Sequence, residues 1–121
     1  MNDINFRAWL KDEQKMVEVT SLNLTTKRIM YDIYKMKSFD EIILMQSTGL
    51  KDKNGKDVYD GDIVNAFDGD NYYLNCCIGY NKGVFYLYKP YHPHFYVLFN
   101  KLQEIEVIGN IYENKELVEN E

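Results

Sequence analysis

The side chains with the clearest capacity for metal chemistry are two histidines and a group of aspartates. His92 and His94 stand two residues apart, a spacing at which a strand could chelate a metal ion with one face. Asp57, Asp60 and Asp62 could supply oxygen ligands to a divalent cation. However, the histidines lie among prolines that favour a loop, and Asp-Gly steps are typical of tight turns. We therefore expect no metal site and a structural role for both groups.

Nucleophilic catalysis has little support in this sequence. The patterns G-x-S-x-G, G-x-x-x-x-G-K-[ST], H-E-x-x-H and G-x-G-x-x-G do not occur. Ser21, Ser38 and Ser47 have no histidine near them in sequence. Cys76 and Cys77 are adjacent, so in a strand they would point to opposite faces as reduced thiols. We expect no enzymatic activity and no cofactor.

Ten aromatic residues crowd the segment 72–99. In Val84–Tyr88 the alternation predicts that Phe85 and Leu87 face the core while Tyr86 and Tyr88 face solvent. Exposed tyrosines form rigid, amphipathic surfaces that suit contacts with proteins or peptides. The alternative is that most of these rings fill the core and rim of a small barrel. The predicted aromatic patch consists of Tyr72, Tyr73, Tyr86, Tyr88, Tyr91 and Tyr96.

A second group of side chains, within 27–37, combines basic and aromatic residues. Such a stripe could contact nucleic acid, and binding would then depend strongly on salt. The net charge of −5 and the pI near 5.0 count against a general nucleic-acid or membrane-surface binder. A nucleic-acid module is therefore the alternative function, and a metal-assisted enzyme is a more distant one. The stripe consists of Lys27, Arg28, Tyr31, Tyr34, Lys35 and Lys37.

The composition is that of one globular domain. The 121 residues are 45% hydrophobic and 15% aromatic, with only two prolines. No apolar stretch approaches the roughly 20 residues of a membrane span, and residues 1–8 lack the pattern of a signal peptide. Charge is uneven, because residues 1–58 carry ten basic and nine acidic groups whereas 59–121 carry four and ten. We expect a soluble, intracellular location and no membrane association.

The elements that must position these groups are mostly strands. Asn5–Leu10 and Met16–Val19 around a polar turn predict an N-terminal β-hairpin, and Ser21–Thr26 predicts a further strand. Lys27–Met36 fits either a helix or a strand. Ser38–Glu41 has the spacing of a capping box, which predicts a short helix that continues into the following apolar run.

Turn residues divide the rest of the chain. Asn54 and Gly55 predict a type I′ hairpin turn. Gly49 and Gly61 stand where the backbone needs a positive φ or a close approach, and Gly109 indicates a bulge or close packing within a strand.

Short strands separated by turns about ten residues apart favour a mainly β fold, a small barrel or roll. The later strands are predicted at Tyr72–Tyr80, Val84–Tyr88, Phe95–Phe99 and Glu106–Tyr112, with Pro90–His94 as a rigid loop.

Three sequence blocks resemble the YopX family of phage and prophage proteins. They are FRAW at positions 6–9 followed by Lys15 and Met16, LMQSTGLKDKNGKDVYDGDIV at 44–64, and EVIGNIYEN at 106–114 followed by Glu116 and Leu117. The blocks fall in register along nearly the whole chain. Lys115 stands where such proteins often carry proline, and 65–100 follows no shared pattern.

The resemblance implies an SH3-type barrel or roll and a phage or prophage gene, and it supplies no catalytic residues. We expect a single domain, 1–121, with an N-terminal hairpin layer at 1–45, a barrel at 46–114 and an acidic tail at 115–121. The expected function is that of a small binding module that contacts a host or phage protein and associates with itself as a homo-oligomer.

Overall fold

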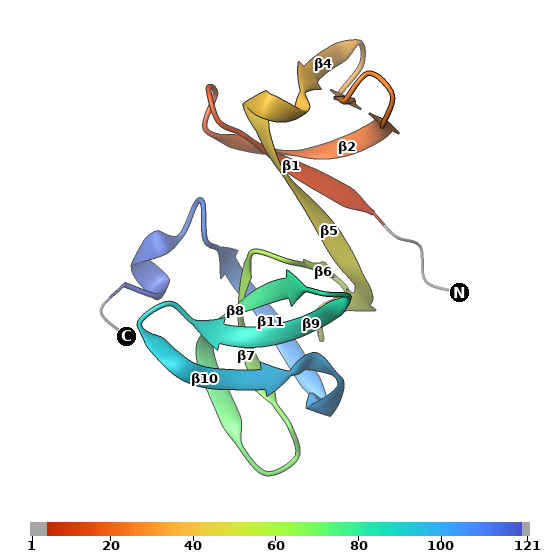
Figure 1. Ribbon diagram of the computed structural model, residues 1–121. Helices are drawn as coiled ribbons and strands as arrows, with labels where there is room; N and C mark the ends of the chain where they lie inside the picture. The colour runs from red at the N-terminus through yellow and green to blue at the C-terminus, as the bar shows by residue number, and fades with distance from the viewer. Residues whose placement is uncertain (1–4, 120–121) are drawn as a thin grey trace. The chain divides into compact units, whose positions relative to one another are not determined.

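The computed structural model describes residues 5–119 and consists mainly of antiparallel strands (Figure 1). The only helical elements in this range are three single 3-10 turns, and none is a helix that could cross a membrane. The chain divides into two compact units, Met1–Ser47 and Thr48–Glu121. The structure therefore confirms the mainly β class.

A six-stranded sheet has the order β4-β3-β2-β1-β5-β6. Apolar side chains of β1, β2, β3 and β5 form the core of the first unit, where Ala8, Leu10 and Ile29 are almost fully buried. The strands are β1 (Phe6–Leu10), β2 (Lys15–Asn23), β3 (Arg28–Tyr31), β4 (Lys35–Ser38), β5 (Ile42–Lys51) and β6 (Asp57–Tyr59).

The predicted N-terminal hairpin is present as β1 and β2. Arg7 pairs with Glu18 and Leu10 pairs with Lys15 in an antiparallel register. The segment 27–36, which fitted either a helix or a strand, forms β3, a turn and the start of β4. The strand state prevails because alternate residues of β3, Ile29 and Tyr31, are buried in the core of the first unit.

The predicted short helix is reduced to one 3-10 turn, η1 (Phe39–Glu41). The capping interaction is real, because Glu41 Oε1 accepts hydrogen bonds from the backbone N–H and the hydroxyl of Ser38, both at 3.0 Å. The prediction that the helix continues into the apolar run is wrong. Ile42 begins β5, which pairs with β1 and buries its apolar side chains there.

The second sheet has the order β10-β9-β8-β7-β11. Within the described residues its end strands, β10 and β11, do not pair with each other, so the sheet is open. Of the two expected forms, a barrel or a roll, the closed barrel is wrong. The core on one face contains Val64, Cys76, Ile78 and Leu87. The strands are β7 (Asp62–Phe67), β8 (Tyr72–Asn81), β9 (Val84–Lys89), β10 (His92–Leu98) and β11 (Glu104–Asn110), with η2 (Phe99–Lys101) before β11.

The predicted rigid loop at 90–94 is also wrong in part. His92, Pro93 and His94 belong to β10, which is an edge strand. The pairing register shifts between His92 and Tyr96, and an irregular edge strand can accommodate a proline that has no N–H to donate.

The turn between β5 and β6 is organised by Asp52 rather than by a type I′ pair. Gly55 N–H donates to the Asp52 carbonyl at 3.0 Å, and Gly55 has φ 85 whereas Asn54 has a negative φ. The buried Asp52 carboxylate accepts the N–H groups of Asn54 and Lys56 on Oδ1, each at 2.9 Å. Its Oδ2 accepts the N–H of Val107 in β11, also at 2.9 Å. A single carboxylate therefore joins the turn to the second sheet.

Residues 111–119 form turns that cover part of the second sheet. The pairing register of β11 shifts between Val107 and Gly109, and a Cβ on Gly109 would lie 2.6 Å from Asn114 Oδ1. The 3-10 turn η3 (Lys115–Leu117) follows, and Val118 is buried beside Cys77. Residues 115–119 of the predicted acidic tail thus pack on the second unit, and 120–121 lie outside the described residues.

Candidate functional site

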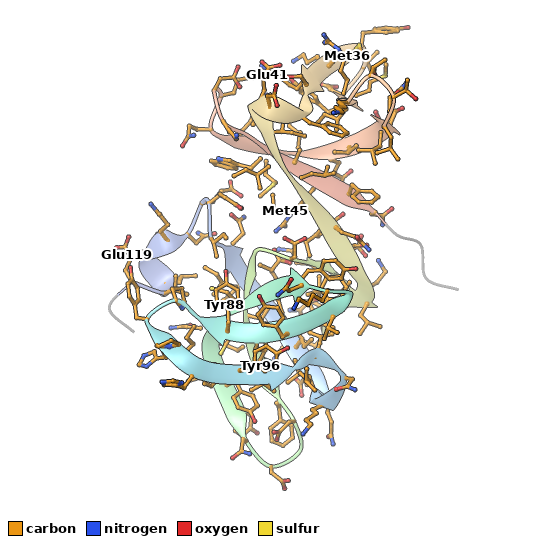
Figure 2. All side chains as sticks on the ribbon, in the orientation of Figure 1. Met36, Glu41, Met45, Tyr88, Tyr96 and Glu119 are labelled. Carbon is orange, nitrogen blue, oxygen red and sulfur yellow. The ribbon has the colours of Figure 1, made fainter. Side chains whose placement is uncertain are left out.

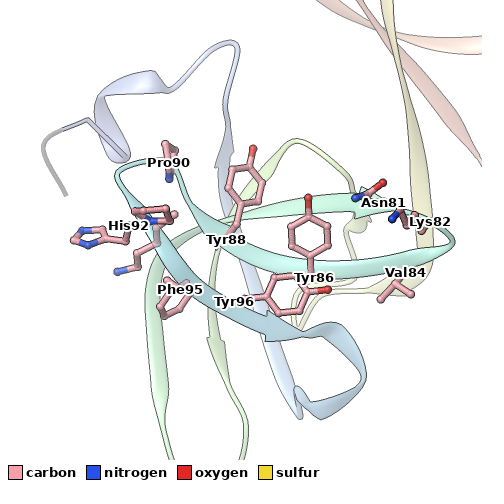
Figure 3. A pocket seen from close by; sticks show the side chains of 11 residues that line it. Asn81, Lys82, Val84, Tyr86, Tyr88, Pro90, His92, Phe95 and Tyr96 are labelled. Atoms are coloured by element: carbon pink, nitrogen blue, oxygen red, sulfur yellow. The ribbon is translucent and has the colours of Figure 1, made fainter.

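The two faces of β9 carry different side chains, as the alternation predicts. Phe85 and Leu87 pack with the main core of the second unit. Tyr86 and Tyr88 lie on the opposite face, and Tyr96 of the neighbouring strand β10 lies beside them (Figures 2 and 3). The sheet therefore gathers three tyrosines on one surface.

Gly79 makes room for this cluster. It pairs with Tyr86 across β8 and β9, and a Cβ at position 79 would lie 2.6 Å from Tyr86 Cζ. Because no Cβ is present, the Tyr86 ring lies close over the β8 backbone. Gly79 is absent from the predicted site residues, although a glycine inside a strand is a recognised sign of close approach.

Tyr86 and Tyr96 form a stacked pair. Their ring centroids are 4.9 Å apart with an interplanar angle of 24°. The Tyr86 and Tyr88 centroids are 5.8 Å apart. Tyr96 remains 56% exposed although it is held against Tyr86. A rigid ring pair with one side open to solvent is a suitable contact surface for another molecule.

Tyr88 anchors the cluster to the protein. It packs against a buried group that includes Ile63, Cys77 and Val118. Burial, and then the nearby Cys77, raises the pKa of the Tyr88 hydroxyl well above its ordinary value. Burial likewise raises the pKa of the Cys77 thiol to about 11, although a hydrogen bond with Tyr88 opposes the shift. Cys77 is thus a neutral, buried thiol that supports the tyrosine.

A groove of about 550 Å³ runs along this surface (Figure 3). The tyrosine rings occupy its middle. Lys82 and Val84 line one end, and Pro90 and His92 line the other. Grooves of this size with aromatic walls and a few polar groups are typical of binding sites.

The charged side chains around the groove are all basic. Lys82 and Lys89 line it, and no aspartate or glutamate does. Among residues 5–119, no carboxylate lies within ion-pair distance of either lysine. The Lys89 ammonium lies 5.4 Å from the centroid of the Phe95 ring.

Three tyrosines of the predicted patch lie elsewhere. Tyr72 is 76% exposed and stacks on Phe67 at a centroid distance of 4.5 Å. Tyr73 donates its hydroxyl to Asp68 at 2.6 Å and belongs to the rim of the main core. Tyr91 is exposed and does not line the groove. Of the six predicted residues, the structure brings together Tyr86, Tyr88 and Tyr96.

Several members of the basic-aromatic stripe are engaged in contacts within the first unit. Tyr31 is buried, and its hydroxyl donates to Glu13 at 3.3 Å. The Lys37 ammonium lies 2.6 Å from Asp12 and 3.4 Å from Glu13. Lys35 pairs with Asp32, whereas Lys27, Arg28 and Tyr34 are exposed.

The candidate metal ligands do not converge. Asp57 pairs with Lys51 at 2.6 Å, and the buried Asp62 accepts the Tyr59 N–H at 2.8 Å. Within residues 5–119 no three His, Cys, Asp or Glu side chains form a group that could hold a metal ion.

Comparison with known proteins identifies the chain's relatives. The model of the YopX protein family matches residues 5–119. The crystal structure of protein EF1440 from Enterococcus faecalis is 30% identical, with a TM-score of 0.65 over 98% of this chain and 100% of that one. The crystal structure of protein yopX from Bacillus subtilis is 21% identical, with a TM-score of 0.59 over 100% and 99% of the two chains, and shows the same fold. No curated protein gave a match. The chain belongs to the YopX family.

Proposed function

We propose that this chain is a binding module that acts through protein–protein contacts, and that the groove around Tyr86, Tyr88 and Tyr96 is its contact surface. The single observation that carries the proposal is the stacked Tyr86–Tyr96 pair, which is held in place by Gly79 while Tyr96 stays open to solvent. Aromatic anchors of this kind contribute much of the binding energy in protein interfaces.

The proposal includes contacts between copies of the chain. Near the tyrosines, Val84 and Leu98 are apolar and more than a third exposed. Symmetric assembly is a common way to bury such surface. We further propose that the module is the product of a phage or prophage gene and acts in the bacterial cytoplasm. The family resemblance supports this setting.

An SH3-type classification of the second unit is part of the same proposal. The strands β7 to β10 are sequential neighbours, and β11 returns after η2 to pair with β7. This connectivity supports an open roll of that type.

Size-exclusion chromatography with light scattering tests the self-association. We expect the measured mass to rise with protein concentration, and we expect Tyr96→Ala to abolish the rise. Tyr72→Ala is the matched control, because Tyr72 is exposed on the same sheet but lies outside the groove. A mass of one chain at every concentration would refute contacts between copies, and equal loss in both variants would refute the groove as the contact surface.

A further inference from the structure

The charge of the groove differs from the charge of the unit that contains it. Residues 59–121 carry four basic and ten acidic groups, yet the charged side chains that line the groove are Lys82 and Lys89. We propose that the groove binds an acidic, extended segment of a partner protein. This inference rests on the proposed function and names the chemistry of the partner.

Charge complementarity is the first argument for an acidic partner. Neither lysine has a carboxylate within ion-pair distance among residues 5–119. Lys82 is exposed, whereas Lys89 is half-buried and its ammonium lies against the Phe95 ring. The imidazole of His92 and the amide of Asn81 also line the groove and can donate hydrogen bonds. Basic side chains around an apolar centre favour a ligand with acidic ends and an apolar middle.

The length of the groove is the second argument. Lys82 lies in the turn two residues before β9, and Lys89 is the last of the six residues of that strand, so the two lysines stand near its opposite ends. Six residues of strand extend about 20 Å. An extended segment of similar length could place a carboxylate near the exposed Lys82 while its central side chains contact Tyr86 and Tyr96. Its far end would lie beside His92 and the end of β9, where the Lys89 ammonium lies against the Phe95 ring.

A nucleic acid fits this surface less well than a peptide. It carries a phosphate at every nucleotide, so a strand that continued beyond the groove would approach the acidic remainder of the unit. A peptide can confine its carboxylates to the two ends of the groove. The charge distribution of the second unit therefore favours the peptide.

A second copy of the chain is a poor source of the extended acidic segment, although its folded surface can still contact the tyrosines. Its most acidic segment, 113–119, is folded into η3 and adjoining turns, and Leu117 and Val118 pack beside Cys77. That segment would have to leave its own unit to become an extended ligand.

The test uses the full chain and three fluorescein-labelled peptides, EELPLPEE, QQLPLPQQ and KKLPLPKK, followed by fluorescence anisotropy at low and high salt. We expect the acidic peptide to bind more tightly than the neutral one and the basic peptide to bind most weakly. Because interactions between exposed charges are screened, the preference should shrink at high salt.

Variants test whether the preference for the acidic peptide arises from the lysines of the groove. The double variant Lys82→Glu, Lys89→Glu should weaken binding of the acidic peptide by about tenfold, as expected for two surface ion pairs. Lys101→Glu is the matched control, because Lys101 is an exposed lysine outside the groove. Circular dichroism and urea unfolding establish that each variant is folded.

The outcomes separate this inference from the proposed function. If the acidic and neutral peptides bind equally and Tyr96→Ala weakens both, the acidic preference is refuted while the aromatic contact surface stands. If no peptide binds, the inference is refuted, and a monomeric mass in light scattering would separately refute contacts between copies. Tighter binding of a labelled thymidine oligonucleotide, lost in the double lysine variant, would overturn the inference in favour of a nucleic acid.

Discussion

The ring of Tyr86 lies over Gly79, its cross-strand partner in the pairing of β8 with β9. The space above a glycine is what allows Tyr86 to lie low on the sheet and stack on Tyr96. Aromatic side chains that cover cross-strand glycines are a known stabilising device in sheets. This pair therefore determines the shape of the proposed contact surface.

Replacing Gly79 should lower the stability of the folded protein. In Gly79→Ala the added Cβ would lie 2.6 Å from Tyr86 Cζ, so the ring must move. We expect a loss of about 1–3 kcal/mol in the free energy of unfolding, as for other overpacked sites. Urea denaturation measures this loss, and a double-mutant cycle with Tyr86→Ala identifies its cause. An equal cost of Gly79→Ala in the presence and absence of the Tyr86 ring would show that the ring is not responsible.

Asp52 should be the most sensitive acidic residue of the β5–β6 turn. In Asp52→Asn the side chain cannot accept all three backbone N–H groups that the carboxylate accepts. We expect a loss of about 1–3 kcal/mol in the free energy of unfolding, because buried donors lose their partners. Asp57→Asn is the matched control, since the partly exposed Asp57–Lys51 pair should contribute no more than about 1 kcal/mol. Similar losses in the two variants would contradict the special role of Asp52.

Stability should fall as the pH drops from about 4 to about 2. The hydrogen bond from the Tyr73 hydroxyl, with those from the Asn71 and Asp70 N–H groups, lowers the pKa of Asp68 to about 2. The ordinary aspartate pKa of an unfolded chain is about 3.9. Because the folded-state pKa is the lower one, this contribution is complete above pH 4 and is lost as the pH falls through 2.

Tyr73→Phe tests the source of that pH dependence. The ring packing against Phe95, at a centroid distance of 5.9 Å, can be retained while the hydroxyl is removed. We expect the melting temperature of this variant to fall less between pH 4 and pH 2 than that of the unmodified chain. The same slope in both proteins would exclude the Tyr73–Asp68 hydrogen bond as a source.

Lys37 should act as a structural residue of the first unit. Its ammonium lies near Asp12, Glu13 and Glu41, and its side chain is only 15% exposed. The hydrogen bond to Asp12 is the main cause that raises the pKa of Lys37. We expect Lys37→Met to lower the urea midpoint at neutral pH, because three carboxylates would lose their shared counter-charge, and added salt should reduce the loss.

Lys35→Met provides the comparison, because Lys35 is more exposed and lies 3.7 Å from a single carboxylate, Asp32. It should change the urea midpoint less than Lys37→Met does. If Lys37→Met leaves the midpoint unchanged but weakens binding of a labelled oligonucleotide, Lys37 is instead part of a nucleic-acid surface.

Local sequence patterns correctly predicted the structural features that depend on residues close together in the chain. The alternation in Val84–Tyr88 predicted which side chains of β9 face the core, because successive residues of a strand point to opposite faces. Polar turn residues located the N-terminal hairpin, and three motif blocks identified the family that the comparison confirmed. Ser38 and Glu41 located the start of η1 for the same local reason.

Long-range contacts in the fold set which distant residues lie together. Tyr31 and Lys37 resembled surface residues in sequence, but the turn that carries Asp12 and Glu13 approaches them from another part of the first unit. The Asp52 carboxylate accepts a hydrogen bond from the N–H of Val107, 55 residues away in sequence, and no local sequence pattern predicts that contact. The apolar run that begins at Ile42 forms a strand because it pairs with β1. Strand pairing and burial depend on long-range contacts. For this reason, local sequence patterns could not predict the open sheet or the aromatic groove.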